Sequence, residues 1–156
     1  MKKMIIALLG LTIFTSCKKE IDEPQNNLEL IRYTVTPKQW QTFGTPGSGN
    51  HGLTYQLEVD ELSSGILTSS LIMVYLVEDI SSLEPLPLTT FLNGENIQQK
   101  FVASRGAIDL YLTAPNSQEL SIENDFDYQV VIAPAAWAKQ AVTNEVELMD
   151  VFPVLE

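Results

Sequence analysis

Two stretches of the chain alternate apolar and polar residues with a period of two, which is typical of strands that bury one face and expose the other. The first spans residues 55–60 and the second residues 108–113. Their apolar positions are Tyr55, Leu57 and Val59 in the first stretch and Ile108, Leu110 and Leu112 in the second. We therefore expect two strands that each cover an apolar core with one face.

Residues 71–77 lack this alternation, because all seven of them are apolar. A strand without a polar face is expected at the centre of a sheet. The run contains β-branched and aromatic residues and has serines on both sides, which favours a strand over a buried helix. Residues 128–133 form a second, mostly apolar run that Pro134 ends, and we expect another strand there.

Glycine, proline and asparagine divide the rest of the chain into short segments. Asn93-Gly94 is a tight-turn signal and predicts a hairpin between residues 88–92 and residues 96–103. The four glycines of residues 44–52 predict a loop. The remaining segments are expected to be an extended loop at residues 83–87, short strands at 28–35, 38–43 and 120–122, a helical turn at 135–141 and a last apolar segment at 146–154.

Together these segments predict an all-β fold of seven to eight strands, with no long amphipathic helix after residue 27. Turn signals at this spacing are typical of a β-sandwich or barrel. The long connection at residues 44–52 favours a Greek-key order over a simple meander. We expect residues 28–156 to form a single antiparallel β-sandwich, Greek-key or immunoglobulin-like, since this length suffices for one domain with its own core.

The beginning of the chain has a different character. Lys2 and Lys3 precede an apolar segment at residues 4–14, which is too short to span a bilayer as a helix and is typical of a signal peptide. Small residues then lead to Cys17, and this arrangement resembles the lipobox of bacterial lipoproteins. The resemblance implies that residues 1–16 are removed and that Cys17 receives a lipid anchor with palmitate or similar acyl chains. The alternatives are an ordinary signal peptide followed by an incidental cysteine, and a buried cysteine of the folded domain.

Residues 17–27 are polar and contain Pro24, so we expect them to act as a flexible tether after the lipidated cysteine. The charged run at residues 19–23 resembles the signal for surface exposure in lipoproteins of the Bacteroidetes. That resemblance implies an outer-membrane lipoprotein exposed at the cell surface. The alternative location is the periplasmic face of the outer membrane.

Charge restricts the possible partners. The chain has a formal net charge of −11, and loss of residues 1–16 with their two lysines leaves 7 basic against 20 acidic residues, or −13. Phosphate backbones and anionic lipid headgroups repel so acidic a surface. We therefore expect no nucleic-acid binding and membrane contact through the lipid alone. Cys17 is the only cysteine, so no internal disulfide is possible.

Candidate catalytic residues are scarce. The chain has one histidine, His51, which we expect to be exposed in its glycine-rich loop, and with Cys17 lipidated it has no set for a Ser/His/Asp or Cys/His triad. Glu123, Asp125 and Asp127 alternate, so in an extended segment they would share one side and could ligate Ca²⁺. The alternative is a set of solvated turn residues. No cofactor is expected otherwise, and we predict that the protein is not an enzyme.

Four aromatic residues are candidates for a ligand platform: Trp40, Phe43, Tyr55 and Trp137. Aromatic side chains at an open surface bind sugar rings or protein partners, whereas in a small β-domain they more often fill the core. A glycan-binding function requires at least two of the four on one open surface.

The order of these motifs resembles a group of small, uncharacterised outer-membrane lipoproteins common in Bacteroidetes. The residues that carry the resemblance are the lipobox, the tether, Trp40, Val74-Tyr75-Leu76, Leu86-Pro87-Leu88 and Tyr128-Gln129-Val130-Val131-Ile132. It implies a shared β-sandwich and transfers no catalytic residue. The expected function is a non-catalytic, lipid-anchored binding or assembly module. The alternatives are a glycan-binding surface lipoprotein and a small carboxylate-dependent hydrolase.

Overall fold

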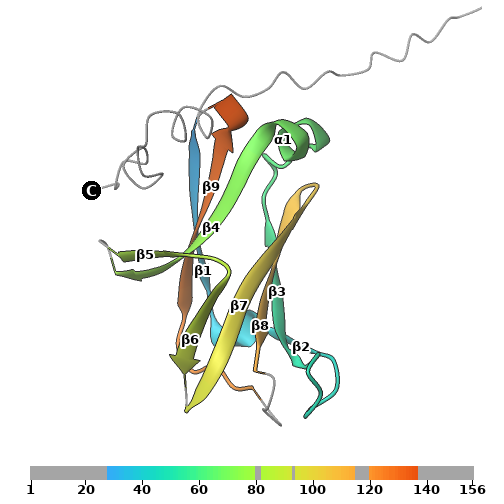
Figure 1. Ribbon diagram of the computed structural model, residues 1–156, viewed down its shortest axis with the longest axis vertical. Helices are drawn as coiled ribbons and strands as arrows, with labels where there is room; N and C mark the ends of the chain where they lie inside the picture. Colours follow the sequence, from blue (N-terminus) through green and yellow to red (C-terminus); the bar gives the residue numbers. More distant parts are fainter. Residues whose placement is uncertain (1–27, 80–81, 93, 115–119, 137–156) are drawn as a thin grey trace, which may run out of the picture.

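The computed structural model describes residues 28–79, 82–92, 94–114 and 120–136. Within these residues two antiparallel sheets lie face to face, which confirms the predicted β-sandwich (Figure 1). The described residues form nine strands, one more than the upper end of the predicted number. The predicted signal peptide and tether, residues 1–27, lie outside the described residues.

One sheet has four strands and the other has five. The four-stranded sheet has the order β1 (Glu29–Val35), β9 (Phe126–Pro134), β4 (Ser70–Asp79) and β5 (Ser82–Pro85). The five-stranded sheet has the order β2 (Gln41–Phe43), β3 (Gly52–Glu58), β8 (Ala107–Thr113), β7 (Glu95–Ser104) and β6 (Leu88–Leu92). Two short helices lie between strands, the 3-10 helix η1 (Pro37–Gln39) and α1 (Ser64–Ser69).

The five-stranded sheet has a Greek-key order. β6, β7 and β8 follow one another in the chain and lie side by side in the sheet. The fourth strand of the motif is β3, which lies beside β8 but is joined to β6 by a long connection. That connection contributes α1, β4 and β5, the last two to the other sheet. The chain therefore crosses between the layers in the connection from β3 to β6. The connection at residues 44–52, from which we expected the Greek-key order, instead joins the neighbouring antiparallel strands β2 and β3 within one sheet.

The apolar positions of both alternating stretches line the core between the sheets. Leu57, Ile108, Leu110 and Leu112 are each at most 2% exposed. Their polar neighbours lie on the outer face, because successive side chains of a strand point to opposite sides. The predicted inward and outward assignment of β3 and β8 is confirmed.

The strand predicted to lack a polar face is β4, which lies between β9 and β5 as expected of a central strand. Val74 and Leu76 face the main core. Tyr75 belongs to a second apolar cluster with Val131 and Ala133, whose side chains are 3%, 1% and 1% exposed. Both faces of this part of the sheet are thus apolar, which explains the continuous apolar sequence.

A buried polar contact joins the two sheets through the core. The Tyr128 hydroxyl on β9 donates to Oε1 of Gln99 on β7 at 2.9 Å, and both residues are 1% exposed. Gln99 Nε2 in turn donates to Oγ1 of Thr90 at 3.3 Å. The hydrogen bonds compensate for the burial of a phenol and an amide that would otherwise destabilise the core.

The predicted hairpin is also confirmed. β6 and β7 pair antiparallel around the turn that includes Gly94, whose φ is +85° and therefore favours glycine. Gly106 has a φ of +74° in the equivalent turn between β7 and β8. Glycine at these two positions allows the tight connections that place three strands side by side.

Several local predictions differ from the structure. Of the strand predicted at residues 38–43 only Gln41–Phe43 is a strand, because Pro37–Gln39 form the 3-10 helix η1. Residues 83–87 include part of β5, because an edge strand accommodates Pro85 where a central strand would not. Residues 120–122 are not a strand, although Leu120 and Ile122 still pack on the core. α1 was not predicted, since its six residues are too few to show helical periodicity. The helical turn predicted at residues 135–141 is described only at its first two residues, and the segment at 146–154 lies outside the described residues.

Candidate functional site

Two of the predicted site residues, Cys17 and Trp137, lie outside the described residues. Lipidation of Cys17 and a ligand-binding role for Trp137 therefore remain predictions. The other candidates lie within the described residues.

Trp40 is a core residue rather than part of an open platform. It follows η1 and is 8% exposed. Its ring makes edge-to-face contacts with Tyr55 and Phe126, at centroid distances of 6.2 and 6.3 Å. The structure therefore removes Trp40 from the predicted aromatic surface, because a tryptophan packed on two rings fills the core.

Phe43 and Tyr55 are both half-buried, but they lie in different surroundings. The Tyr55 hydroxyl accepts a hydrogen bond from Gln39 Nε2 at 2.9 Å, which holds its ring against Trp40. Phe43 lies on the outer face of the five-stranded sheet and packs edge-to-face on Tyr111 at 5.6 Å. Phe43 is thus the candidate aromatic that the structure places clearly on an outward-facing sheet surface.

His51 is buried, at 3% exposure, so the prediction of an exposed loop histidine was wrong. Its Nδ1 lies 3.1 Å from the Phe43 carbonyl oxygen, across the loop between β2 and β3. Gly44, at the start of the same loop, has a φ of +75° and packs against the Asn50 carbonyl. The contact between His51 and the Phe43 carbonyl joins the two ends of this loop, which Gly44 allows to fold closely. The composition of the loop did not indicate this contact.

The acidic residues do not form a metal-binding set. Glu123, Asp125 and Asp127 are all exposed, and the Asp127 Oδ1 accepts a hydrogen bond from Thr34 Oγ1 at 2.6 Å. No group of three or more His, Cys, Asp or Glu side chains within the described ranges is arranged to hold a metal ion. The described residues therefore offer no support for a calcium site at Glu123, Asp125 and Asp127.

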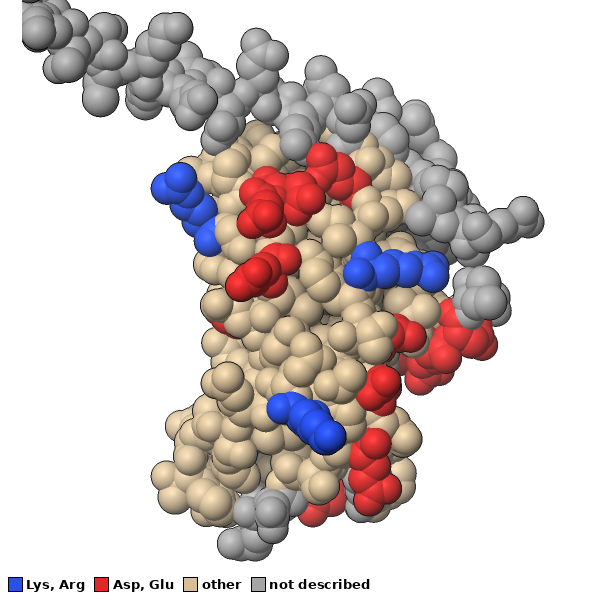
Figure 2. Space-filling model, turned by 180° about the vertical axis from the view of Figure 1, so that it is seen from behind, with Lys and Arg blue, Asp and Glu red and all other residues tan. Residues whose placement is uncertain are grey.

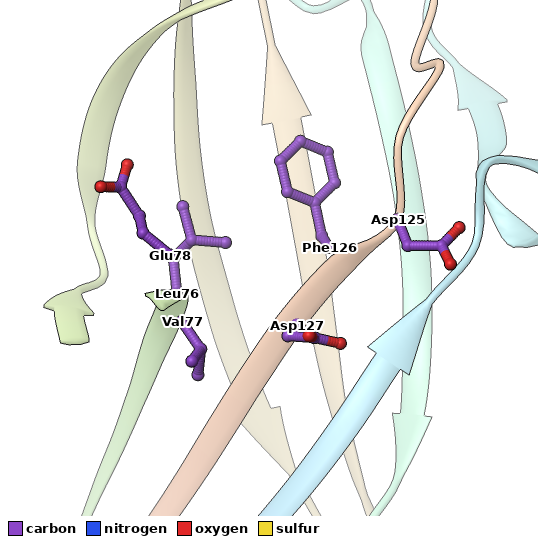
Figure 3. A pocket seen from close by; sticks show the side chains of 6 residues that line it. All are labelled: Leu76, Val77, Glu78, Asp125, Phe126 and Asp127. Atoms are coloured by element: carbon purple, nitrogen blue, oxygen red, sulfur yellow. The ribbon is translucent and has the colours of Figure 1, made fainter. Parts of the chain in front are cut away.

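A hollow of about 430 Å³ lies where β4 ends and β9 begins. Its lining residues are Leu76, Val77, Glu78, Asp125, Phe126 and Asp127 (Figure 3). The carboxylates of Glu78 and Asp125 point away from each other in Figure 3. A pair of acids that acts on one glycosidic bond has to face a common site. This pair does not, so the hollow offers no support for the hydrolase alternative.

A different surface combines an aromatic ring with polar side chains, on the outer face of the five-stranded sheet. We call it the amide–tyrosine patch, and it consists of Gln41, Thr54, Gln56, Asp109 and Tyr111. A hollow of about 350 Å³ lies at this patch, lined by Gln41, Thr54, Tyr55, Gln56 and Asp109. Tyr111 does not line the hollow but lies beside it, opposite Thr54 on the neighbouring strand.

Strand register brings the patch together. Gln41 pairs with Thr54 and Thr54 with Tyr111, which makes one row across β2, β3 and β8. Gln56 pairs with Asp109 in the neighbouring row. Opposed side chains in a sheet have Cβ atoms about 4.5–5.5 Å apart, so each row forms a continuous line of side chains.

Contacts within and beside the patch fix its side chains. Gln56 Nε2 donates to Asp109 Oδ1 at 2.8 Å. The Phe43 and Tyr111 rings pack at an interplanar angle of 86°, and Lys100 Nζ on β7 lies over the Tyr111 ring, 5.6 Å from its centre. A carboxylate, an amide and an aromatic ring are thereby held on one outward-facing surface.

The sequence contained part of this information. The alternation of residues 108–113 already indicated that Asp109 and Tyr111 face away from the core. It gave no sign that Gln56, 53 positions earlier in the chain, would lie opposite Asp109. Register between distant strands depends on the whole sheet, so Tyr111 was missed as a site residue.

The acidic side chains at the surface agree with the negative net charge of the sequence. Figure 2 shows acidic side chains gathered on the visible face, whereas the basic side chains there are separated from one another. An anionic ligand therefore meets a repulsive surface over this face.

No protein-family model, curated protein or solved structure matches this chain. None of the helices in the described part of the chain is long and apolar enough to cross a membrane.

Proposed function

We propose that this protein is a non-catalytic, lipid-anchored outer-membrane lipoprotein of the kind found in Bacteroidetes, and that its β-sandwich is a binding or assembly module of the cell envelope. The proposed location is the cell surface, with the periplasmic face of the outer membrane as the alternative. Nucleic acid is not a proposed partner, because the chain carries a net charge of −11.

The observation that carries the proposal is the beginning of the chain. Two lysines, an apolar segment of residues 4–14 and Cys17 follow one another at the spacing of a lipoprotein signal. Lipid attachment at Cys17 would leave residues 18–27 as a tether before the first described residue, Leu28. Two or three acyl chains hold a protein firmly at a membrane, because each buried CH₂ contributes about 0.8 kcal/mol.

The anchor is tested by growing cells with labelled palmitate. The full chain is expected to take up the label and to fractionate with membranes, and Cys17→Ala is expected to lose both properties. Cys17→Ser is the matched control for thiol chemistry, and it should behave as Cys17→Ala does. Incorporation that survives both substitutions would show that the anchor lies elsewhere.

Glycan binding is the second candidate function, and one specific observation favours it. The amide–tyrosine patch combines an aromatic ring with hydrogen-bonding side chains on an outward-facing sheet surface beside Phe43. Ligand sites characteristically combine apolar contact area with a few fixed polar groups. No comparable observation favours the hydrolase.

A further inference from the structure

The polar groups of the amide–tyrosine patch suit the rim of a sugar ring, which presents neighbouring hydroxyl groups that both donate and accept hydrogen bonds. Asp109 accepts one bond from Gln56, and its carboxyl oxygens have further lone pairs for ligand hydroxyls. Gln56 retains its amide oxygen as an acceptor. The Gln56–Asp109 hydrogen bond orients both groups before a ligand arrives, which lowers the entropic cost of binding.

The ring of Tyr111 suits the face of a sugar, which presents C–H groups to an aromatic surface. Phe43 packs on Tyr111 at an interplanar angle of 86° and thereby holds the ring in place. Lys100 Nζ lies 5.6 Å from the ring centre. Because Lys100 is exposed and its stem has four rotatable bonds, a ligand can displace the ammonium at small cost.

The size of the patch also suits a small ligand. Neighbouring strands in a sheet lie about 4.8 Å apart, and residues two positions apart on one strand lie about 6.7 Å apart. The two rows of the amide–tyrosine patch therefore cover an area close to that of a sugar ring. The hollow of about 350 Å³, which Gln56 and Asp109 line and Tyr111 borders, lies within the range of small-molecule sites. β2 is three residues long and ends its pairing with β3 at Thr54, which leaves the hollow open at that edge of the sheet.

Charge selects among sugars. Asp109 is itself anionic, and the chain has 20 acidic against 9 basic residues. A saccharide that carries uronate or sulfate would meet like charge at the centre of the site. A neutral saccharide has no such penalty.

We propose that the amide–tyrosine patch is a binding site for neutral saccharides, with Asp109 and Gln56 bound to ring hydroxyls and Tyr111 stacked on the ring. This proposal deepens the second candidate function and rests on it. It does not depend on the lipid anchor, so the palmitate experiment and a saccharide experiment fail independently.

The test uses the full chain purified in detergent. Calorimetric titrations use neutral oligosaccharides built from glucose, mannose or galactose, with polygalacturonate as the anionic comparison. The oligosaccharides of at least one of these three neutral sugars are expected to bind, whereas polygalacturonate is expected not to bind. Asp109→Ala and Tyr111→Ala are each expected to weaken that binding at least about tenfold, the effect of losing one or two good contacts.

Two substitutions on the same sheet face serve as matched controls. Gln98→Ala removes an exposed amide from β7, and Phe91→Ala removes a ring that is 73% exposed on β6. Both are expected to leave the affinity within about twofold of the unaltered chain. Lys100→Met is expected to retain binding, because it removes the ammonium and keeps an apolar stem. Thermal unfolding of every variant establishes that its fold is intact.

Several results would overturn the proposal. Absence of binding by every neutral series at about 10 mM would do so, as would binding of polygalacturonate alone. Equal losses in the Asp109→Ala, Tyr111→Ala and control variants would also contradict it, because the patch would then have no special role.

Discussion

At the scale of single residues, the aromatic side chains serve different purposes that their positions in the sequence do not distinguish. Trp40 and Tyr128 fill the core, whereas Phe43 and Tyr111 lie on an outer sheet face. The difference follows from the face of the strand on which each residue lies and from its neighbours across the sheet.

Trp40→Ala is expected to destabilise the fold by about 3–5 kcal/mol, because it leaves a large cavity between Tyr55 and Phe126. Urea unfolding followed by fluorescence or circular dichroism measures the change in unfolding free energy. Phe91→Ala is the control, since that ring is 73% exposed, and it should change stability by no more than about 0.5 kcal/mol. Similar losses in the two variants would contradict the burial of Trp40.

Tyr128 is expected to make stability fall in alkaline solution. Burial raises the pKa of the Tyr128 phenol well above its usual range. Above about pH 10 the tyrosine ionises in the unfolded chain before it does so in the folded protein, so unfolding releases a proton and becomes more favourable. The contribution is complete below pH 10 and is lost as pH rises toward the folded pKa, by up to about 1.4 kcal/mol per pH unit.

Tyr128→Phe isolates this effect. Urea unfolding between pH 8 and 11 should show a shallower alkaline loss of stability in the variant than in the unaltered chain. At neutral pH the variant should be less stable by about 1–3 kcal/mol, because Gln99 Oε1 loses its buried donor. Identical pH profiles for the two proteins would show that Tyr128 does not remain protonated in the folded state.

At the scale of elements, the patterns with a clear period were the most informative. The alternation in β3 and β8 predicted two strands and their buried faces, and the continuous apolar run of β4 predicted a central strand. β5 and α1 were not predicted. With four and six residues they are too short to show a period, and their formation depends on contacts with the rest of the fold.

The junction between β2 and β3 gives a test of close packing within a sheet. A Cβ at Gly52 would lie 2.0 Å from the Leu112 carbonyl oxygen, so Gly52→Ala must displace backbone in β8. We expect a loss of more than about 2 kcal/mol in unfolding free energy, because overpacking here strains main chain rather than a flexible side chain. Gly49→Ala is the matched control from the preceding loop, where a Cβ meets nothing within 4 Å. Comparable stability of the two variants would contradict the described pairing of β3 with β8.

At the scale of the whole molecule, the described residues form a two-layer β-sandwich, and the membrane anchor that we propose would lie at Cys17, before the first described residue. The all-β class and the two-layer architecture were predictable from the sequence, since they follow from periodicity and turn residues. The candidate saccharide site was not, because Gln56 and Asp109 meet only through strand register. The burial of His51 was equally invisible, since it depends on how its loop closes.

The most direct test of the central claim is the intact mass of the amino-terminal peptide from protein extracted from cell membranes. We expect a peptide that begins at Cys17 and carries a diacylglycerol group with an acylated amino terminus. A peptide that retains residues 1–16, or that contains Cys17 as a free thiol, would contradict the account of this protein as a lipid-anchored module of the cell envelope.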